Sequence, residues 1–311
     1  MIRSIIPSSR RSGGATDADL PRRGPSVLKA LCTALALTIL PAGIAPALAA
    51  DHGKVLVILS SASELEIQGG KHFKTGFYLD ELVVPLRKIV AAGFTPVFAN
   101  PNGNAVTIAP DSNDKMFFGG DDAARADAVS YVESIPELKH PKTFAEILRG
   151  GTAGYVGVFI PGGHAPLQDL GQNPELGKIL VTFHETGRPT AVLCHGPMAL
   201  VSTVSDPAAF RSAMIAGDFA TANKIAASWP YAGYRLTVFS PFEETALTGM
   251  LGGKVLFNAA DALGQAGAHI DLVANFHPNV LEDREVVSGQ QPFSSDALGD
   301  AFVAKLKAAH S

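Results

Sequence analysis

The stretch Pro189-Thr-Ala-Val-Leu-Cys194-His195-Gly196-Pro197 decides the fold. It joins a short apolar strand, residues 190–193, to a predicted helix that begins near Pro197, because proline already has the backbone φ of a first helical turn. A strand that turns this sharply into a helix lifts the side chain at the turn above the edge of a sheet. The residue two positions later must then be small, as Gly196 is. The pattern predicts that Cys194 lies at a nucleophile elbow.

A cysteine at the start of a helix faces unpaired N–H groups and the positive end of the helix dipole, which favour the thiolate. We therefore expect the pKa of Cys194 to lie below its ordinary value and the sulfur to act as a nucleophile. The alternative is a buried, inert cysteine that closes a core strand.

Short β-rich runs alternate with helical patterns along the chain, which is typical of a parallel sheet covered on both faces. Predicted strands cover residues 54–60, 94–99, 156–160, 190–193, 236–240 and 270–274. Predicted helices cover residues 76–92, 174–186 and 294–309, and a small edge hairpin is expected at residues 280–287. Residues 100–154 are the least regular part, and we expect them to cover one side of the site. The sequence thus predicts an α/β three-layer sandwich with a mostly parallel central sheet.

The first 49 residues have the pattern of an export signal. An apolar run at residues 28–40 follows basic residues, and Ala47-Leu48-Ala49 supplies the small side chains that a signal peptidase needs. The run is short and prolines follow it, which favours a cleaved signal over an uncleaved membrane anchor. We expect a signal peptide at residues 1–49, one domain at residues 50–311, no stable membrane span, and a periplasmic or secreted protein.

Charge and cysteine content exclude two classes of protein. The chain has 25 basic and 29 acidic residues, and the leader is rich in basic ones, so the mature part is more acidic than the whole. A nucleic-acid partner is therefore not expected. Of the two cysteines, Cys32 lies in the leader and Cys194 has no partner, which excludes a disulfide framework.

A second loop, Pro161-Gly-Gly-His164, also follows an apolar strand. In a parallel sheet both loops open at the same carboxyl edge. Gly162 and Gly163 would let backbone N–H groups approach a substrate oxygen, as an oxyanion hole requires, with His164 beside them. A plain tight turn is the alternative interpretation. The remaining histidines show no metal-ligand spacing, and no metal site is expected.

Three motifs together resemble the ThiJ/PfpI superfamily, and within it the branch of glyoxalase III enzymes and heat-shock chaperones. They are Lys74-Thr-Gly-Phe-Tyr-Leu-Asp-Glu81, Pro161-Gly-Gly-His164 and Ala191-Val-Leu-Cys-His-Gly-Pro197, of which the last is the most specific. The resemblance runs from Val55 to the C-terminus and implies a flavodoxin-like, glutamine amidotransferase-like fold and a homodimer. The chain departs from this branch at Ala165-Pro166, which stiffens the loop, and in a longer segment at residues 205–234.

The resemblance implies roles for four side chains. It makes Cys194 the nucleophile, His195 its neighbouring base, and Glu81 a helix carboxylate close to the sulfur. Pro85 has no N–H for the carbonyl of Glu81, so the helix is loosened there. The carboxylate that orients the histidine falls on Glu244, with Glu243 as a close competitor.

The activity that the resemblance implies is a cofactor-independent, glyoxalase III-like lyase of the D-lactate dehydratase type. Small 2-oxoaldehydes such as methylglyoxal would add to Cys194 as a hemithioacetal and leave as hydroxy acids such as lactate. The backbone amides of Gly163 and His195 would stabilise the oxyanion. Two other classes stay open: an envelope stress chaperone or redox sensor without turnover, and a Cys-dependent amidase or peptidase.

Overall fold

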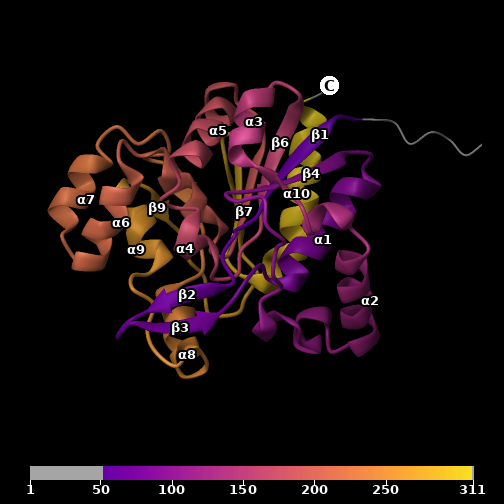
Figure 1. Cartoon of the computed structure of the whole chain (residues 1–311), viewed down its shortest axis with the longest axis horizontal. Coiled ribbons are helices and arrows are strands. Elements are labelled where there is room, and N and C mark those ends of the chain that lie inside the picture. Colours follow the sequence, from indigo (N-terminus) through magenta and orange to yellow (C-terminus); the bar gives the residue numbers. More distant parts are fainter. Residues whose placement is uncertain (1–51, 310–311) are drawn as a thin grey trace, which may run out of the picture. The chain divides into compact units, whose positions relative to one another are not determined.

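The computed structural model describes residues 52–309 (Figure 1). The predicted signal peptide at residues 1–49 lies outside the described residues. Within residues 52–309, no helix is both long enough and apolar enough to cross a bilayer.

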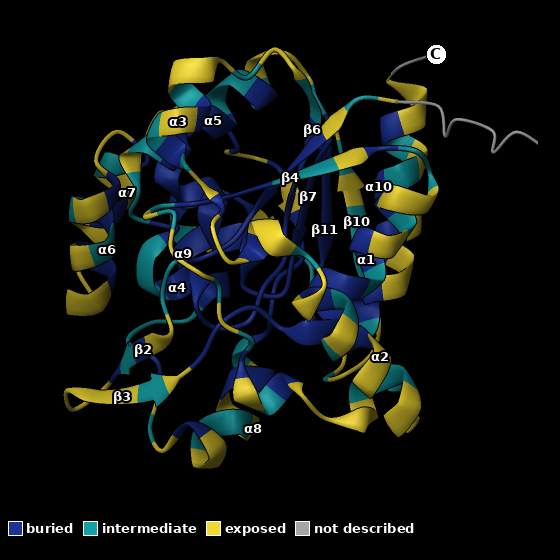
Figure 2. Cartoon of the chain, turned by 45° about the vertical axis from the view of Figure 1, so that its right-hand side comes forward, coloured by how far each residue is buried: buried dark blue, intermediate teal, exposed yellow. Residues whose placement is uncertain are grey.

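The centre of the described part is a seven-stranded sheet with the order β10-β11-β7-β6-β1-β4-β5. All neighbours are parallel except the hairpin pair β10 and β11. Its strands are β1 (Lys54–Ile58), β4 (Thr95–Asn100), β5 (Lys142–Thr143), β6 (Tyr155–Ile160), β7 (Thr190–Leu193), β10 (Val280–Asp283) and β11 (Val286–Gly289). Both inner strands β7 and β11 are buried along their whole length (Figure 2). This explains why they have continuous apolar or small residues instead of an alternating pattern.

Two hydrophobic cores lie on the two faces of this sheet, and successive residues of β1 alternate between them. Val55 and Val57 belong to the core beneath α1 (Leu79–Ala91), α2 (Asp122–Glu133) and α10 (Ser295–Ala308). Leu56 and Ile58 belong to the other core. That core packs against α3 (Phe144–Gly150), α5 (Pro174–Glu185), α6 (Pro207–Ala216), α9 (Ala259–Ala266) and the 3-10 helix η4 (Gly196–Thr203). The three-layer α/β architecture predicted from the sequence is confirmed.

The remaining elements surround the carboxyl edge of the sheet or lie beside it. They are the hairpin β2 (Glu64–Ile67) and β3 (Lys71–Lys74), the helices α4 (Pro166–Asp169), α7 (Phe219–Ile225) and α8 (Pro241–Leu251), the small pair β8 (Arg235–Leu236) and β9 (His269–Ile270), and the 3-10 turns η1 (Pro110–Ser112), η2 (Lys115–Phe118), η3 (Pro136–Leu138) and η5 (Pro292–Ser294). The β2–β3 hairpin and α8 lie at the same end of the molecule (Figure 1), and a bridge between Ile67 and Val255 joins the hairpin to the segment after α8. The long segment at residues 205–234 contains α6 and α7.

The structure departs from the sequence-based assignments in two places. The strands predicted at residues 236–240 and 270–274 are only two residues each, and they form a separate sheet. After Leu236 the backbone bonds elsewhere: Thr237 N–H donates to the side chain of Ser288, and Phe239 N–H to the carbonyl of Cys194. The β2–β3 hairpin was not predicted. The edge hairpin predicted at residues 280–287 is present as β10 and β11, with β10 as the outer strand of the sheet and β11 beside β7.

Candidate active site

Cys194 lies at the turn between β7 and η4, with a positive φ of 58°. A non-glycine residue in this region is strained, and the surrounding structure must hold it there. Its N–H donates to the carbonyl of Gly289 in β11 (2.9 Å), and its own carbonyl accepts from Phe239 N–H (3.1 Å). The helix after the elbow is 3-10, not the α-helix expected from the sequence. The geometry directs one side chain, only 3% exposed, toward the carboxyl edge of the sheet.

Three groups contact the sulfur of Cys194. Its Sγ lies 3.3 Å from Nδ1 of His195. The backbone N–H of Gly163 donates to the sulfur, and the carboxyl group of Glu81 meets it from α1. Gly162 N–H donates to Oε2 of Glu81 at 2.9 Å, while Oε1 has no nitrogen or oxygen partner among the described residues. The glycine loop therefore fixes the carboxyl group and the sulfur together.

The two glycines of this loop are required by its packing. A Cβ on Gly162 would lie 2.6 Å from Cβ of Cys194 and 2.7 Å from Oε2 of Glu81. Gly163 has a φ of +85°, and a Cβ there would collide with the carbonyl oxygen of Gly76. Side chains at either position would separate the loop from the sulfur, so the glycines allow its close approach.

Burial raises the pKa of Cys194 well above its ordinary value, and the charge of Glu81 raises it further. The lowered pKa of Cys194 expected from the sequence is wrong, because loss of hydration and a nearby carboxylate outweigh the donors at the start of a 3-10 helix. The pKa of Glu81 is raised as well, by its burial and by the charge of Asp80. When the Cys194 thiol and the Glu81 carboxyl group together lose one proton, the sulfur and the carboxylate share a single negative charge.

Glu244, in the first turn of α8, holds two histidines. Its Oε2 lies 2.8 Å from Nε2 of His195, and its Oε1 lies 2.9 Å from Nε2 of His164. The two imidazole rings have centroids 4.3 Å apart, and the ring of Phe239 packs 4.8 Å from that of His195. All three polar side chains are buried.

Glu243 has a different function from its neighbour. It forms a capping box with Ser240 at the start of α8, and its carboxylate also accepts from Phe276 N–H at 2.7 Å. The structure thus places Glu244, not Glu243, against His195. Through these contacts Glu243 holds the loop at residue 276 against the start of α8.

The contacts of His195 define its tautomer. Since Glu244 can only accept, Nε2 of His195 carries the proton, and Nδ1 presents a lone pair to the thiol of Cys194. Burial and the neighbouring His164 lower the pKa of His195, which keeps its ring neutral and leaves the lone pair of Nδ1 free to accept a proton. Burial opposes the charged form of His164 as well, but Glu244 outweighs it and raises the pKa of His164. The two histidines overcome the effect of burial on Glu244, and its pKa is lowered.

His164, His195 and Glu244 are also the group among residues 52–309 whose ligand atoms lie close enough to hold a metal ion, all within 4.8 Å of one another. Two imidazoles and a carboxylate are suitable ligands for zinc. Here, however, each carboxylate oxygen already pairs with one imidazole nitrogen, so the three side chains satisfy one another's hydrogen bonds. The metal-free site predicted from the sequence stays a prediction.

A cavity of about 400 Å³ opens above the sulfur. Residues 111–117, from the segment expected to cover one side of the site, form part of its wall. The lining consists of Tyr78, Asp111, Asp114, Met116, Phe117, Gly163, His164, Cys194, His195, Phe239, Leu247, Met250, Phe276, Pro292 and Phe293. Sequence reasoning missed most of these side chains, because they come from loops with no motif of their own.

Comparison with known proteins agrees with this geometry. A family model described as the DJ-1/PfpI family matches residues 73–205, which contain Glu81, the glycine loop and the elbow. The chain belongs to the DJ-1/PfpI superfamily. This is the superfamily that the three sequence motifs resemble.

Two relatives of this DJ-1/PfpI protein are named "Protein/nucleic acid deglycase HchA". The one from Pseudomonas aeruginosa is 27% identical over 254 residues, which cover 79% of this chain and 78% of the relative. The one from Staphylococcus aureus is 27% identical over 259 residues, covering 80% and 78%. The alignments extend well beyond the matched family segment, so most of the described domain is shared.

Solved structures show the same fold. Glyoxalase III from Candida albicans has a TM-score of 0.62 at 20% identity and covers 82% of this chain and 97% of its own. The 24 kDa rapid encystment protein of Francisella tularensis has a TM-score of 0.60 at 19% identity, covering 82% and 99%.

Proposed function

We propose that this DJ-1/PfpI protein is a cofactor-independent enzyme with a glyoxalase- or deglycase-like activity, which converts reactive 2-oxoaldehydes such as methylglyoxal to hydroxy acids such as lactate. The names of its relatives, deglycase and glyoxalase III, support this general class of activity. The observation that carries the proposal is the placement of one sulfur between a neutral imidazole and a buried carboxyl group, at the base of a cavity.

The first step is addition of the thiol to the aldehyde. The S–H proton passes to Nδ1 of His195, the S–C bond forms, and the carbonyl oxygen takes the proton back to give a hemithioacetal. Glu244 stabilises the imidazolium that forms for a moment, as its two short contacts to the histidines allow. The raised pKa of Cys194 suits this route, because the thiol is ionised when substrate is present and not before.

The second step moves hydrogen from the aldehyde carbon to its neighbour. Glu81, as carboxylate, removes the C1 proton and gives an enediol, and a proton returned to C2 gives a thioester of Cys194. Water then cleaves the S–C bond, which releases the hydroxy acid and restores the thiol. The net reaction adds one water to the substrate, and no oxidant, reductant or metal enters it.

The decisive experiment follows methylglyoxal consumption and lactate formation by the purified protein. We expect turnover that Cys194→Ala abolishes. Glu81→Gln should lower kcat by roughly 10²–10⁴, the usual contribution of a general base. Lactate made in D₂O should carry deuterium at C2 if the proton passes through Glu81, whereas a direct hydride shift would leave hydrogen there.

Other outcomes would favour the other two classes. Absence of turnover together with suppressed aggregation of unfolded clients would support a stress chaperone. Hydrolysis of amide substrates would support a Cys-dependent amidase. Burial and protonation make Cys194 a slow target for peroxide, which gives the redox-sensor hypothesis less support.

Export and dimerisation also remain part of this proposal. If residues 1–49 are a signal peptide, the expressed protein should lose them and fractionate with the periplasm or medium. Mass spectrometry of the N-terminus tests the cleavage after Ala49, and light scattering of the purified protein tests the homodimer. An intact leader in the cytoplasmic fraction would contradict export.

A further inference from the structure

The wall of the active-site cavity is acidic and aromatic. Among the described residues, no lysine or arginine lines it, whereas two aspartates do, Asp111 and Asp114. Five of its lining side chains are Tyr or Phe rings: Tyr78, Phe117, Phe239, Phe276 and Phe293. An anionic substrate would find no positive partner here outside the histidines bound to Glu244. A cationic group would find both partners that it prefers, a carboxylate and ring faces.

Asp111 is the unusual member of this wall. It lies in η1, and both of its carboxylate oxygens are shielded from solvent without a hydrogen-bond partner among the described residues. An unpaired buried carboxylate is costly, so a ligand that supplies a positive charge is favoured by relief of that cost. By contrast, Asp114 is exposed and its carboxylate accepts from Met116 N–H at 2.9 Å. Of the two, Asp111 is therefore the one that lacks a partner.

Aromatic rings line the same cavity as Asp111. The rings of Tyr78 and Phe117 meet edge to face with centroids 5.0 Å apart, and Phe293 lies 5.9 Å beyond Phe117. The charge of Asp111 acts on Tyr78, whose pKa is raised by burial first and by this carboxylate next. The carboxylate and the ring are thus close enough to act on one bound group.

The size of the cavity points in the same direction. At about 400 Å³ it lies within the range of roughly 300–1,000 Å³ that buries drug-sized ligands. A three-carbon aldehyde held at Cys194 would leave most of this space unused. A substrate with a further ring or chain would fill it.

We infer that Asp111 and the rings of Tyr78, Phe117 and Phe293 form a subsite for the cationic end of a larger 2-oxoaldehyde whose aldehyde carbon reaches Cys194. This inference depends on the proposed function for its chemistry, but not for its binding. Asp111 is then a specificity-determining residue that never touches the reacting atoms.

A pair of substrates of equal shape tests the subsite. Phenylglyoxal with a 4-trimethylammoniomethyl group is cationic, and its 4-neopentyl analogue is neutral with the same outline. We expect the wild-type protein to prefer the cation by roughly tenfold in kcat/KM, the size of a cation–π contact with a carboxylate nearby. Asp111→Asn should bring the ratio close to one. Asp114→Asn, the matched control, should keep the preference, since asparagine also caps a helix. A wild-type ratio near one, or a preference that survives Asp111→Asn, overturns the inference.

A binding measurement separates this inference from the proposed function. Benzyltrimethylammonium has no carbonyl group and needs no chemistry at Cys194. Titration calorimetry should show it binding to wild-type protein and to Cys194→Ala, and at least tenfold more weakly to Asp111→Asn. Equal affinity for all three proteins, or no binding to any, overturns the subsite even if aldehydes are turned over. Binding without aldehyde turnover would instead reject the proposed reaction and keep the subsite.

Discussion

Two histidine–glutamate clusters, one buried and one partly buried, lie at opposite ends of strand β7. The first, which holds His164, His195 and Glu244, lies at the carboxyl end beside Cys194. The second, which holds His184, Tyr234 and Glu285, lies at the amino end, where the carbonyl of Glu285 accepts from the N–H of Thr190. Both bring imidazole and carboxylate within 2.9 Å. The pairs of atoms are alike, and their surroundings are not.

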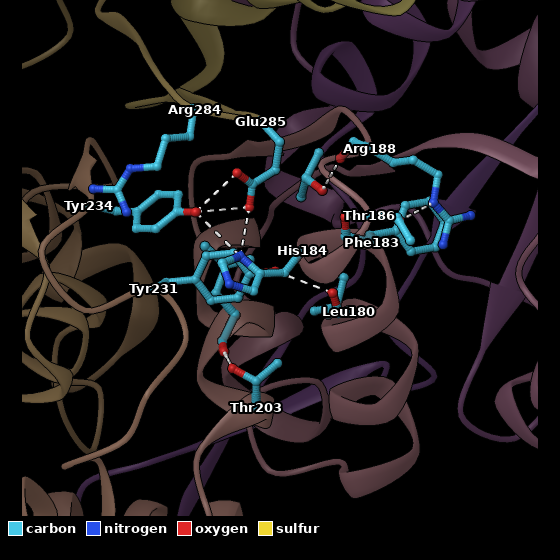
Figure 3. A network of polar contacts seen from close by, with 12 residues as sticks. Leu180, Phe183, His184, Thr186, Arg188, Thr203, Tyr231, Tyr234, Arg284 and Glu285 are labelled. Carbon is cyan, nitrogen blue, oxygen red and sulfur yellow. Dashed lines mark hydrogen bonds and ion pairs between the residues drawn. The ribbon is translucent and has the colours of Figure 1, made fainter. Parts of the chain in front are cut away.

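Glu285 is satisfied on all sides (Figure 3). Tyr234 OH donates to its carboxylate at 3.0 Å, Nδ1 of His184 lies 2.9 Å away, and the guanidinium of Arg284 covers the Tyr234 ring at 3.7 Å. No nucleophile stands in this cluster. It joins three elements instead: α5, the end of the 205–234 segment, and the β10–β11 turn.

The two clusters differ in what the imidazole faces besides the carboxylate. At the carboxyl end the imidazole of His195 has its second nitrogen directed at a thiol, and the group borders a cavity. At the amino end Nδ1 of His184 faces both the carboxylate of Glu285 and the hydroxyl of Tyr234, so this contact stabilises the fold. A histidine–glutamate contact gains a catalytic use from what its free nitrogen faces.

The largest expected effect is on turnover, from the same substitution made in each cluster. Glu244→Gln should lower kcat for 2-oxoaldehydes by roughly 10³–10⁴, because the amide no longer fixes the Nε2–H tautomer or stabilises the imidazolium of His195. Glu285→Gln should leave kcat within about twofold. Steady-state kinetics at pH 7 with correctly folded protein provides the comparison. Similar losses from both variants would mean that the two clusters do not differ in the way we describe.

A third buried carboxylate sharpens the comparison, because it lacks the full set of partners that Glu285 has. Asp80 accepts from Ser295 Oγ at 2.8 Å through one oxygen, and its other oxygen has no partner among the described residues. Burial raises its pKa from 3.8 to about 7. A carboxyl group with a raised folded pKa favours the folded state below its unfolded pKa and loses that contribution as the pH rises through the folded value.

Asp80→Asn mimics the protonated form, so its benefit should grow with pH. Relative to wild type, the free energy of unfolding should change little at pH 4 and increase by up to about 4 kcal/mol by pH 8, since each pKa unit is worth about 1.4 kcal/mol. Urea unfolding across this range measures it. Glu133→Gln, which changes an exposed carboxylate on α2, is the control and should show no such trend. A constant difference at all pH values would exclude the titration of Asp80 as the cause.

Because the cluster around Glu285 stabilises the fold, removal of one of its hydrogen bonds should lower the free energy of unfolding by a moderate amount. Tyr234→Phe removes the hydroxyl that donates to Glu285 and leaves a buried carboxylate short of a partner, which should cost about 1–3 kcal/mol. Activity should not change, because the cluster lies at the other end of β7. Tyr155→Phe is a suitable control, since it removes a phenol from a partly exposed ring. Denaturant unfolding gives the free energy, and a loss of kcat without loss of stability would contradict the assignment.

The elbow and the strands of the central sheet could be predicted because each is encoded by neighbouring residues. The contact of Glu81 with the sulfur was implied by the family resemblance and not by any local pattern. Cys194 lies directly between an apolar strand and a helix former, and Gly162 and Gly163 leave room that any side chain would fill. A local sequence pattern is enough to predict a contact that forms within a single turn of the chain.

Other features depend on contacts between distant segments, and sequence reasoning missed them. The pKa of Cys194 was expected to fall because the helix start was visible, whereas the depth of burial and the distance to Glu81 were not. The second histidine on Glu244 and the unpaired Asp111 come from loops that meet only in the folded chain. The strands predicted at residues 236–240 and 270–274 were too long for two different reasons. Leu236 and Val238 fill a core without joining the central sheet, whereas Leu272 and Val273 are exposed.

The smallest expected effect concerns the pH dependence of the first cluster. Glu244 raises the pKa of His164, so this pair should stabilise the fold fully below the ordinary histidine pKa and lose that contribution as the pH rises through the raised value. Glu244 has a lowered pKa, and its own contribution should be lost only as the pH falls well below the usual carboxylate range. His164→Gln keeps a hydrogen bond to Glu244 but cannot carry charge, so it should be less stable than wild type near pH 6 and approach it near pH 9. His184→Gln in the second cluster is the matched control, and if both variants followed the same pH profile, charge on His164 would not explain it.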